Sequence, residues 1–112
     1  MLLKLDKKIE QRLGISIDKM SEFCQTWGIT EMALFGSVLR EDFKPDSDID
    51  FLITFSPNVP QGLLTLAKIK NKLESMLNRQ VDIALKESIQ TSNNWIIQRE
   101  ILRTAKMIYE QR

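Results

Sequence analysis

The sequence predicts an α+β fold in which helices pack on a small mixed β-sheet. Segments with apolar residues at helical spacing alternate with short apolar runs of strand length. The resulting order is helix, helix, strand, short helix, strand, helix, strand, helix. A chain of 112 residues is long enough for a single core, and we expect residues 1–112 to form one domain.

Two helices are predicted at the start of the chain, each with an apolar stripe and a stop signal. Gly14 and Gly28 are plausible C-terminal stops, and Ser16 is a candidate N-cap for the second helix. The stripes consist of Leu2, Leu5, Ile9 and Leu13 in the first helix, and Ile17, Met20, Cys24 and Trp27 in the second.

Three strands are predicted at residues 30–35, 48–55 and 80–85, and a loop is predicted at Lys44-Pro45-Asp46. The second strand is apolar on both faces beyond its first residues, which suits a central strand covered by helices. Two further helices are expected over residues 61–77 and about 92–109, with Ser92 as a candidate cap. Their stripes are Leu63, Leu66, Ile69, Leu73 and Met76, and Ile97, Ile101, Ala105 and Ile108.

The composition excludes several kinds of chemistry. The chain has one cysteine and no histidine, so it cannot form an internal disulfide, a Ser-His triad, a Cys-His dyad or a thiolate or imidazole zinc site. Sixteen basic and fifteen acidic residues leave a net charge of +1, which gives no electrostatic footprint for nucleic acid. The apolar runs are too short to span a membrane, and the N-terminus lacks the pattern of a signal peptide. We therefore expect a cytoplasmic protein without a membrane partner.

The segment from Gly36 to Asp50 is the most informative part of the chain. Gly36-Ser37 follows an apolar run, and a glycine turn with free backbone N–H groups suits a phosphate. Asp48 and Asp50 stand two residues apart beside the next apolar run. In a strand such residues point to the same face, with Cα atoms roughly 6.6 Å apart, so their carboxylates repel each other unless a cation lies between them. Carboxylates together with substrate phosphates are the usual ligands of Mg²⁺.

The pattern Gly-Ser, then Arg, then Ser-Asp-x-Asp resembles the nucleotidyltransferase superfamily typified by DNA polymerase beta and the aminoglycoside nucleotidyltransferases. It is most similar to the minimal bacterial members, which are paired with HEPN-domain proteins in toxin–antitoxin modules. The resemblance is dense over residues 33–55 and extends weakly to Val81-Asp82-Ile83, where the family places its third carboxylate. It implies the polymerase beta-like fold for this chain.

The resemblance also implies a set of site residues. Asp48, Asp50 and Asp82 would be the catalytic carboxylates and Mg²⁺ ligands, with Asp82 serving alternatively as the base for the attacking hydroxyl. Asp48 and Asp50 could instead be a cap and a solvated strand end, and Asp82 a surface or ion-paired residue. In the strand, Asp82 should point away from the core side taken by Val81 and Ile83.

The predicted nucleotide-binding residues are Gly36, Ser37, Arg40 and Ser47. Gly36 and Ser37 could equally form a plain turn, and Arg40 could pair with Glu41 or Asp42 rather than with phosphate. Ser47 is expected to orient the loop before the aspartates. One departure from the family pattern is Glu41, where many relatives have glycine, which puts the local turn geometry in question.

The tryptophans allow different interpretations. Trp27 lies on an apolar stripe and is expected in the core rather than against a base. Trp95 could pack on the sheet, stack on a nucleobase or anchor a partner protein.

The function implied by the resemblance is Mg²⁺-dependent transfer of a nucleoside monophosphate, AMP from ATP, to an acceptor hydroxyl. Larger relatives carry a second domain for the acceptor, so here the acceptor is expected from another subunit or a partner, in a homo- or hetero-oligomer. The resemblance points to a tyrosine of a HEPN-domain toxin, with the chain as antitoxin. The alternative is a non-catalytic antitoxin that neutralises its partner by occlusion. A nucleic-acid-directed transferase is a third interpretation, disfavoured by the neutral charge.

Overall fold

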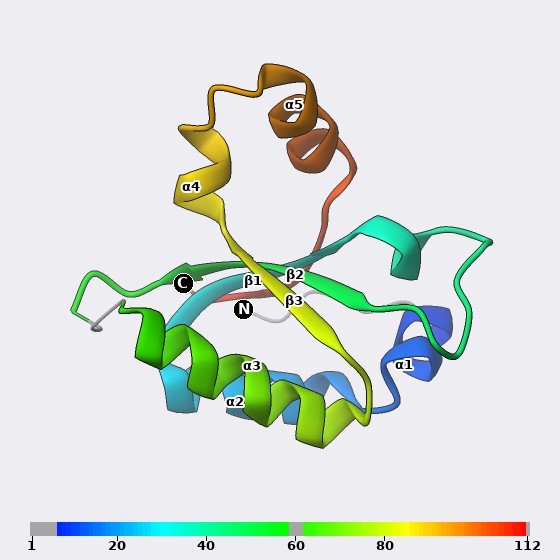
Figure 1. Ribbon diagram of the computed structural model, residues 1–112. Coiled ribbons are helices and arrows are strands. Elements are labelled where there is room, and N and C mark those ends of the chain that lie inside the picture. Colours follow the sequence, from blue (N-terminus) through cyan, green and yellow to red (C-terminus); the bar gives the residue numbers. More distant parts are fainter. Residues whose placement is uncertain (1–6, 59–61, 112) are drawn as a thin grey trace.

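A computed structural model describes residues 7–58 and 62–111 of the chain (Figure 1). Its centre is a four-stranded mixed sheet with the strand order β3-β2-β1-β4. Strand β1 pairs antiparallel with β2 and with β4, whereas β2 and β3 run parallel. The α+β class with a mixed sheet, predicted from the sequence, is confirmed. The elements are α1 Lys7–Leu13, α2 Ile17–Trp27, β1 Ile29–Phe35, the 3₁₀ helix η1 Gly36–Leu39, β2 Ile49–Phe55, α3 Leu63–Leu77, β3 Val81–Leu85, α4 Lys86–Gln90, α5 Trp95–Thr104 and β4 Lys106–Glu110.

The two faces of the sheet are covered differently. Helices α2 and α3 lie together on one face, and α4 and α5 stand on the other (Figure 1). The main core fills the α2–α3 side, where alternate residues of the strands meet the apolar stripes of the helices. Among the fully buried side chains there are Met32, Leu34, Ile49, Phe51 and Ile53. The opposite face of β2 carries Asp50, Leu52 and Thr54, of which Leu52 is buried and the other two are partly exposed.

The helix ends follow the signals in the sequence. The hydroxyl of Ser16 accepts a hydrogen bond from the N–H of Lys19, and α2 ends at Gly28 in the left-handed conformation. The N–H of Gly14 donates to the carbonyl of Glu10 at the end of α1. Ile9 and Leu13 of the first stripe are buried, while Leu2 and Leu5 lie outside the described residues.

Trp27 is half-buried against the core with its ring 6.1 Å from that of Phe23, which confirms the core interpretation for this tryptophan. Trp95, in contrast, is 63% exposed, so the prediction that it could pack on the sheet is wrong.

The prediction of one helix over residues 92–109 is wrong beyond Thr104. Helix α5 ends at Thr104, and residues 106–110 form β4, which pairs with β1 and buries Ile108 and Tyr109. The apolar spacing that suggested a continued helix is also compatible with a short strand, and pairing with the edge of β1 decides between them. The N-cap of α5 is Asn94, whose side chain accepts from the N–H of Ile97, and not Ser92.

Within residues 7–58 and 62–111, no helix has both the length and the apolar composition needed to cross a membrane.

Candidate active site

Asp50 and Asp82 are brought side by side by the parallel pairing of β2 with β3. The two residues are direct Cα partners in the register. On β2, Ile49 and Phe51 point into the core, so Asp50 between them points to the opposite face. On β3, Val81 is buried and Asp82 is exposed, as predicted from the alternation of the strand. Asp48 lies one residue before β2 and is exposed.

The surroundings of Asp50 disfavour its negative charge. Partial burial, the charges of Asp82 and Asp48, and a hydrogen bond with Asp82 raise the pKa of the Asp50 carboxyl to about 6, against a weaker opposing effect of Arg40. Three carboxyl groups thus share one end of the sheet, and among residues 7–58 and 62–111 the opposing charge of Arg40 does not outweigh the effects that raise the pKa of Asp50. Such a site gains free energy when a positive ion enters it.

Gly36 lies directly against the carboxylate of Asp50. Its φ is +80°, a conformation that glycine adopts without strain, and a Cβ atom at this position would stand 2.3 Å from the Asp50 Oδ2. Both the backbone angle and the close approach therefore require glycine here. The sequence indicated a glycine turn, but the contact with Asp50 depends on the register between β1 and β2, in which Phe35 pairs with Asp50.

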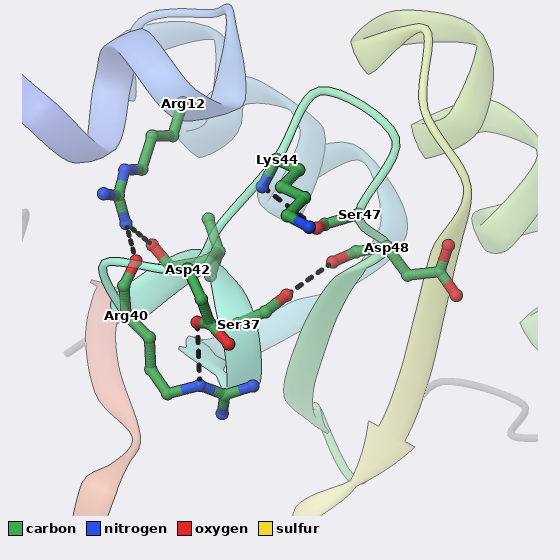
Figure 2. Close-up of polar contacts among 8 residues, drawn as sticks. Arg12, Ser37, Arg40, Asp42, Lys44, Ser47 and Asp48 are labelled. Carbon is green, nitrogen blue, oxygen red and sulfur yellow. Dashed lines mark hydrogen bonds and ion pairs between the residues drawn. The ribbon is translucent and has the colours of Figure 1, made fainter.

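Ser37 connects the glycine turn to the aspartate segment. Its hydroxyl donates a hydrogen bond of 3.3 Å to the backbone carbonyl of Asp48 (Figure 2). Figure 2 shows the carboxylate of Asp48 turned away from this hydroxyl. The contact fixes the start of β2 relative to η1, so that the predicted phosphate-binding turn and the predicted metal ligands form one unit.

Arg40 forms an ion pair with Asp42, with 3.2 Å between Nε and Oδ1. This is one of the two surface pairings that the sequence allowed for Arg40 as an alternative to phosphate binding. Both side chains are exposed, and an exposed ion pair contributes little free energy, so the pair can open for an anionic ligand at small cost. The Glu41 carboxylate is directed to α1 instead, where it contacts Lys8 at 3.0 Å.

The loop between η1 and β2 is held by two arginines that the sequence did not indicate. Arg79 donates to the carbonyls of Lys44, Pro45 and Ser47 at 3.1, 2.9 and 3.1 Å. Within the loop, the Ser47 hydroxyl accepts from the N–H of Lys44 at 3.0 Å, which fits the orienting role predicted for Ser47.

The other end of this loop is held by Arg12 of α1. Its Nη1 donates to the carbonyls of Val38 and Arg40, both at 2.7 Å (Figure 2). The guanidinium carbons of Arg12 and Arg79 lie 5.4 and 4.5 Å from the ring centroid of Phe43. We call Arg12, Phe43 and Arg79 the loop brace. Arginines at helix ends are common on protein surfaces, and no local pattern distinguishes these two, because their acceptors are more than 25 residues away in sequence.

The carboxylates of the site have the chemistry that Mg²⁺ prefers, although they are not gathered into a closed cage. Across the described ranges 7–58 and 62–111, no group of three or more Asp, Glu, Cys or His side chains is arranged to hold a metal by itself. Mg²⁺ is usually held by one or two carboxylates together with substrate phosphates, which is a more open arrangement. Asp48, Asp50 and Asp82 beside the Gly36 turn fit that arrangement.

On this sheet a glycine-serine turn packs against paired aspartates on neighbouring strands, which is the arrangement expected for a nucleotidyltransferase. Residues 17–105 match the nucleotidyltransferase domain family. The chain is also 32% identical over 94 residues to the protein adenylyltransferase MntA of Thermococcus cleftensis, covering 84% of this chain and 93% of that protein. The chain therefore belongs to the nucleotidyltransferase domain family, as a minimal member with the polymerase beta-like fold, and the enzyme class predicted from the sequence is confirmed.

Solved structures show the same fold. A toxin–antitoxin complex with AMP-PNP contains a chain that matches with a TM-score of 0.66 at 17% identity, covering 88% of this chain and 76% of that one. An MNT antitoxin in complex with the tri-AMPylated HEPN toxin of Shewanella oneidensis gives a TM-score of 0.60 at 16% identity, covering 92% of this chain and 73% of the other. At these identities the likeness extends to the fold only.

Proposed function

We propose that this chain transfers AMP from ATP to a tyrosine hydroxyl of a HEPN-domain toxin and thereby acts as its antitoxin. The observation that carries the proposal is the contact of Gly36 with Asp50, next to Asp82 in the strand register. It puts a turn suited to phosphates directly beside a carboxylate pair that needs a cation. The relative named protein adenylyltransferase MntA, and the antitoxin fold found with an AMPylated HEPN toxin, support the choice of reaction and partner.

In the proposed reaction the tyrosine oxygen attacks the α-phosphorus of ATP. A bond forms between these two atoms, the bond from the α-phosphorus to the bridging oxygen of the β-phosphate breaks, and pyrophosphate leaves with that electron pair. Asp82 takes the proton of the attacking hydroxyl. Its exposed position on an edge strand lets a macromolecular acceptor reach it. The turn at Gly36 and Ser37, with Arg40, binds the β- and γ-phosphates.

Mg²⁺ is the proposed cofactor: Asp48 and Asp50 would hold the ion that binds the nucleotide, and Asp82 beside them is the base. The ion would neutralise phosphate charge and the charge that develops on the leaving oxygen. The chain's own part is to keep three carboxyl groups at one end of the sheet, with Ser37 and the loop brace fixing where β2 begins. The raised pKa of Asp50 is the expected property of such a site without its cation.

The proposal is tested by label transfer. The full chain is incubated with Mg²⁺, ATP labelled at the α-phosphate and a co-expressed HEPN-domain partner. We expect the label on the partner with wild type, and its loss with Asp48→Asn plus Asp50→Asn or with the partner's acceptor tyrosine changed to Phe. A labelled partner with the double aspartate variant would contradict the role of these residues.

One observation favours a second function, that of a binding module. No residue of α5 is fully buried, and its first turn exposes Trp95, Ile96 and Ile97 at 63%, 63% and 52%. An exposed tryptophan among isoleucines is typical of a protein-binding surface. Neutralisation by occlusion predicts that the double aspartate variant still suppresses the toxicity of the partner in cells, whereas neutralisation by AMP transfer predicts that suppression is lost.

A further inference from the structure

The connection between β3 and β4 forms an arch over the face of the sheet that carries Asp50 and Asp82. In the order β3-β2-β1-β4 these two strands are the opposite edges, so the residues that join them cross the whole sheet. Figure 1 shows β3 leading into α4, and α5 leading back to the sheet. The side chain of Gln98 donates a hydrogen bond to the carbonyl of Gln90, which ties α5 to α4. The arch therefore stands on the side from which an acceptor approaches Asp82.

Helix α5 is attached to the sheet through its second half. Ile101 lies opposite Phe35 across a cleft, and Leu102 lines a small cavity together with Leu52 of β2. The first turn is more exposed than this half, with Trp95 and Ile96 both 63% exposed. The large apolar side chains of the first turn are therefore not used in the packing of the arch on the sheet.

The exposed side of α5 combines apolar surface with an unpaired positive charge. Arg99 follows Trp95 by four positions and Ile96 by three, so the three side chains are neighbours on the helix surface. Arg103 is paired with Glu100, whereas Arg99 forms no ion pair within residues 7–58 and 62–111. We call Trp95, Ile96 and Arg99 the α5 outer face. Its composition is typical of protein-binding surfaces, in which Trp and Arg are enriched.

Charge decides between two occupants of the α5 outer face. In a twofold pairing of two copies centred on this face, the same residues approach each other from both copies. Arg99 lies near the middle of α5, Trp95–Thr104, so it would meet the Arg99 of the second copy, and the two unpaired positive charges would repel each other. A different protein that presents an apolar patch with a carboxylate complements both the apolar and the charged part of the face.

The position of the α5 outer face fits the acceptor protein of the proposed reaction. The 10 residues of α5 span about 15 Å, and Thr104 at its end lines the same cleft as Gly36. An interface that buries about 800 Å² per partner is about 30 Å across. A protein seated on the first turn of α5 is therefore wide enough to extend to the active-site end of the sheet as well.

We propose that the α5 outer face is the docking surface for the acceptor protein, and that this protein presents an apolar patch with an acidic side chain opposite Arg99. The inference rests on the proposed function, because that function supplies the acceptor protein. It divides two tasks within the chain. The site at Asp50 and Asp82 carries out the transfer, and the arch selects the protein that receives AMP.

The test measures AMP transfer against the concentration of the purified HEPN-domain partner at saturating Mg²⁺-ATP, and complex formation between the two proteins without nucleotide. Trp95→Ala removes apolar surface from the α5 outer face, and Arg99→Glu reverses its charge. Each variant has a matched control on α3, which lies on the opposite face of the sheet (Figure 1): Leu63→Ala, at a leucine that is 86% exposed, and Lys68→Glu, at an exposed lysine. All four positions are exposed, and melting curves establish that each variant is folded.

We expect Trp95→Ala and Arg99→Glu to raise the KM for the partner at least about tenfold, since truncating an interface hot spot has an effect of this size. The kcat at saturating partner and the affinity for Mg²⁺-ATP should not change. The affinity of wild type for the partner should fall as salt is added, and this dependence should be reduced in Arg99→Glu. Both α3 controls should keep the wild-type KM.

A wild-type KM in the folded Trp95→Ala and Arg99→Glu variants would overturn the inference and leave the proposed function standing. An equal rise of the KM in the α3 controls would do the same. If wild type binds the partner without transferring AMP, and Trp95→Ala no longer binds it, the proposed function fails while the docking surface stands. Failure of wild type both to bind and to transfer would overturn both.

Discussion

Gly36 shows how one residue joins the fold to the proposed chemistry. Gly36 and Gly14 both have a positive φ, of +80° and +79° respectively. Of these two glycines, Gly36 alone has another group, the Asp50 carboxylate, close to the position of a Cβ atom. An alanine at Gly14 would meet no atom within 4 Å, whereas at Gly36 it would collide with the carboxylate. Replacing Gly14 therefore tests the destabilisation caused by the positive φ alone, and replacing Gly36 tests the positive φ together with the steric clash with Asp50.

We predict that Gly36→Ala and Gly14→Ala each lower the free energy of unfolding, by about 1–3 kcal/mol for the strained backbone. Gly36→Ala should in addition displace Asp50 and weaken Mg²⁺-ATP binding, while Gly14→Ala should leave binding at the wild-type level. Thermal unfolding and calorimetric titration on the same preparations measure both effects. Equal ATP affinity in the two folded variants would show that Gly36 serves only the turn and has no part in nucleotide binding.

The raised pKa of Asp50 predicts a pH-dependent effect of its replacement on stability. A pKa of about 6 in the folded protein, above the ordinary value of 3.8, means that the folded state binds the proton more tightly than the unfolded state. Ionisation of Asp50 therefore destabilises the metal-free protein, and this loss is complete above about pH 6. Asp50→Asn should raise the melting temperature of the metal-free protein at pH 7–8.

The gain from Asp50→Asn should shrink as the pH falls from 6 to 4, because the carboxyl of the folded wild type becomes protonated over this range while that of the unfolded chain does so only near its ordinary pKa of 3.8. Melting curves between pH 4 and 8 in a chelating buffer measure the difference. Asp46→Asn, at an exposed position in the preceding loop, is the control for the loss of one negative charge. A difference between Asp50→Asn and wild type that does not vary with pH would show that repulsion at Asp50 is not its cause.

At the scale of elements, the predictable parts were those determined by local sequence. The cap at Ser16 and the stop at Gly28 each depend on residues within a few positions, and the structure has both. The predicted stripe of α3 is present in part: Ile69 and Leu73 are buried, whereas Leu63 at its start is 86% exposed. Strand β4 depends on pairing with β1, more than 70 residues earlier, and its helical spacing was therefore misleading. The candidate site shows the same limit: the motif residues were recognisable from the sequence, whereas the loop brace arises from contacts between residues far apart in the chain.

The loop brace leads to a prediction about nucleotide binding. Arg79→Met keeps the aliphatic stem but removes the donor to three carbonyls, so the loop that carries Ser47 should lose its fixed geometry. We expect a loss of about 1–3 kcal/mol in unfolding free energy, together with an increased KM for ATP. Arg79→Lys should restore the KM only in part, because an ammonium group cannot reproduce the planar fork.

The control for the loop brace is Lys68→Met, at an exposed lysine on α3. Steady-state transfer is measured well below the melting temperature of each variant, so that a lower fraction of folded protein cannot raise the KM. A variant that melts earlier but has the wild-type KM would limit Arg79 to a structural role.

At the scale of the whole molecule, the two faces of the sheet have separate tasks. The α2–α3 face carries the main core, and the row Asp82, Asp50, Phe35 lies on the other face of the sheet. Helices α4 and α5 stand on that face (Figure 1). Because β3 is an edge strand, Asp82 faces solvent while Asp50 is half-buried. This arrangement leaves the acceptor side of the proposed reaction open to a partner.

Asp82→Ala tests this division, because Asp82 is placed to act on the acceptor more than on the nucleotide. Mg²⁺-ATP affinity should remain near wild type, since Asp48 and Asp50 still hold the nucleotide metal. Transfer to the partner should fall about 10²–10⁴-fold, the usual contribution of a general base. As an exposed side chain, Asp82 contributes little to the core, so the melting temperature should change little. ATP affinity, melting temperature and transfer rate are measured on one preparation, and a normal rate per folded molecule would exclude the catalytic role.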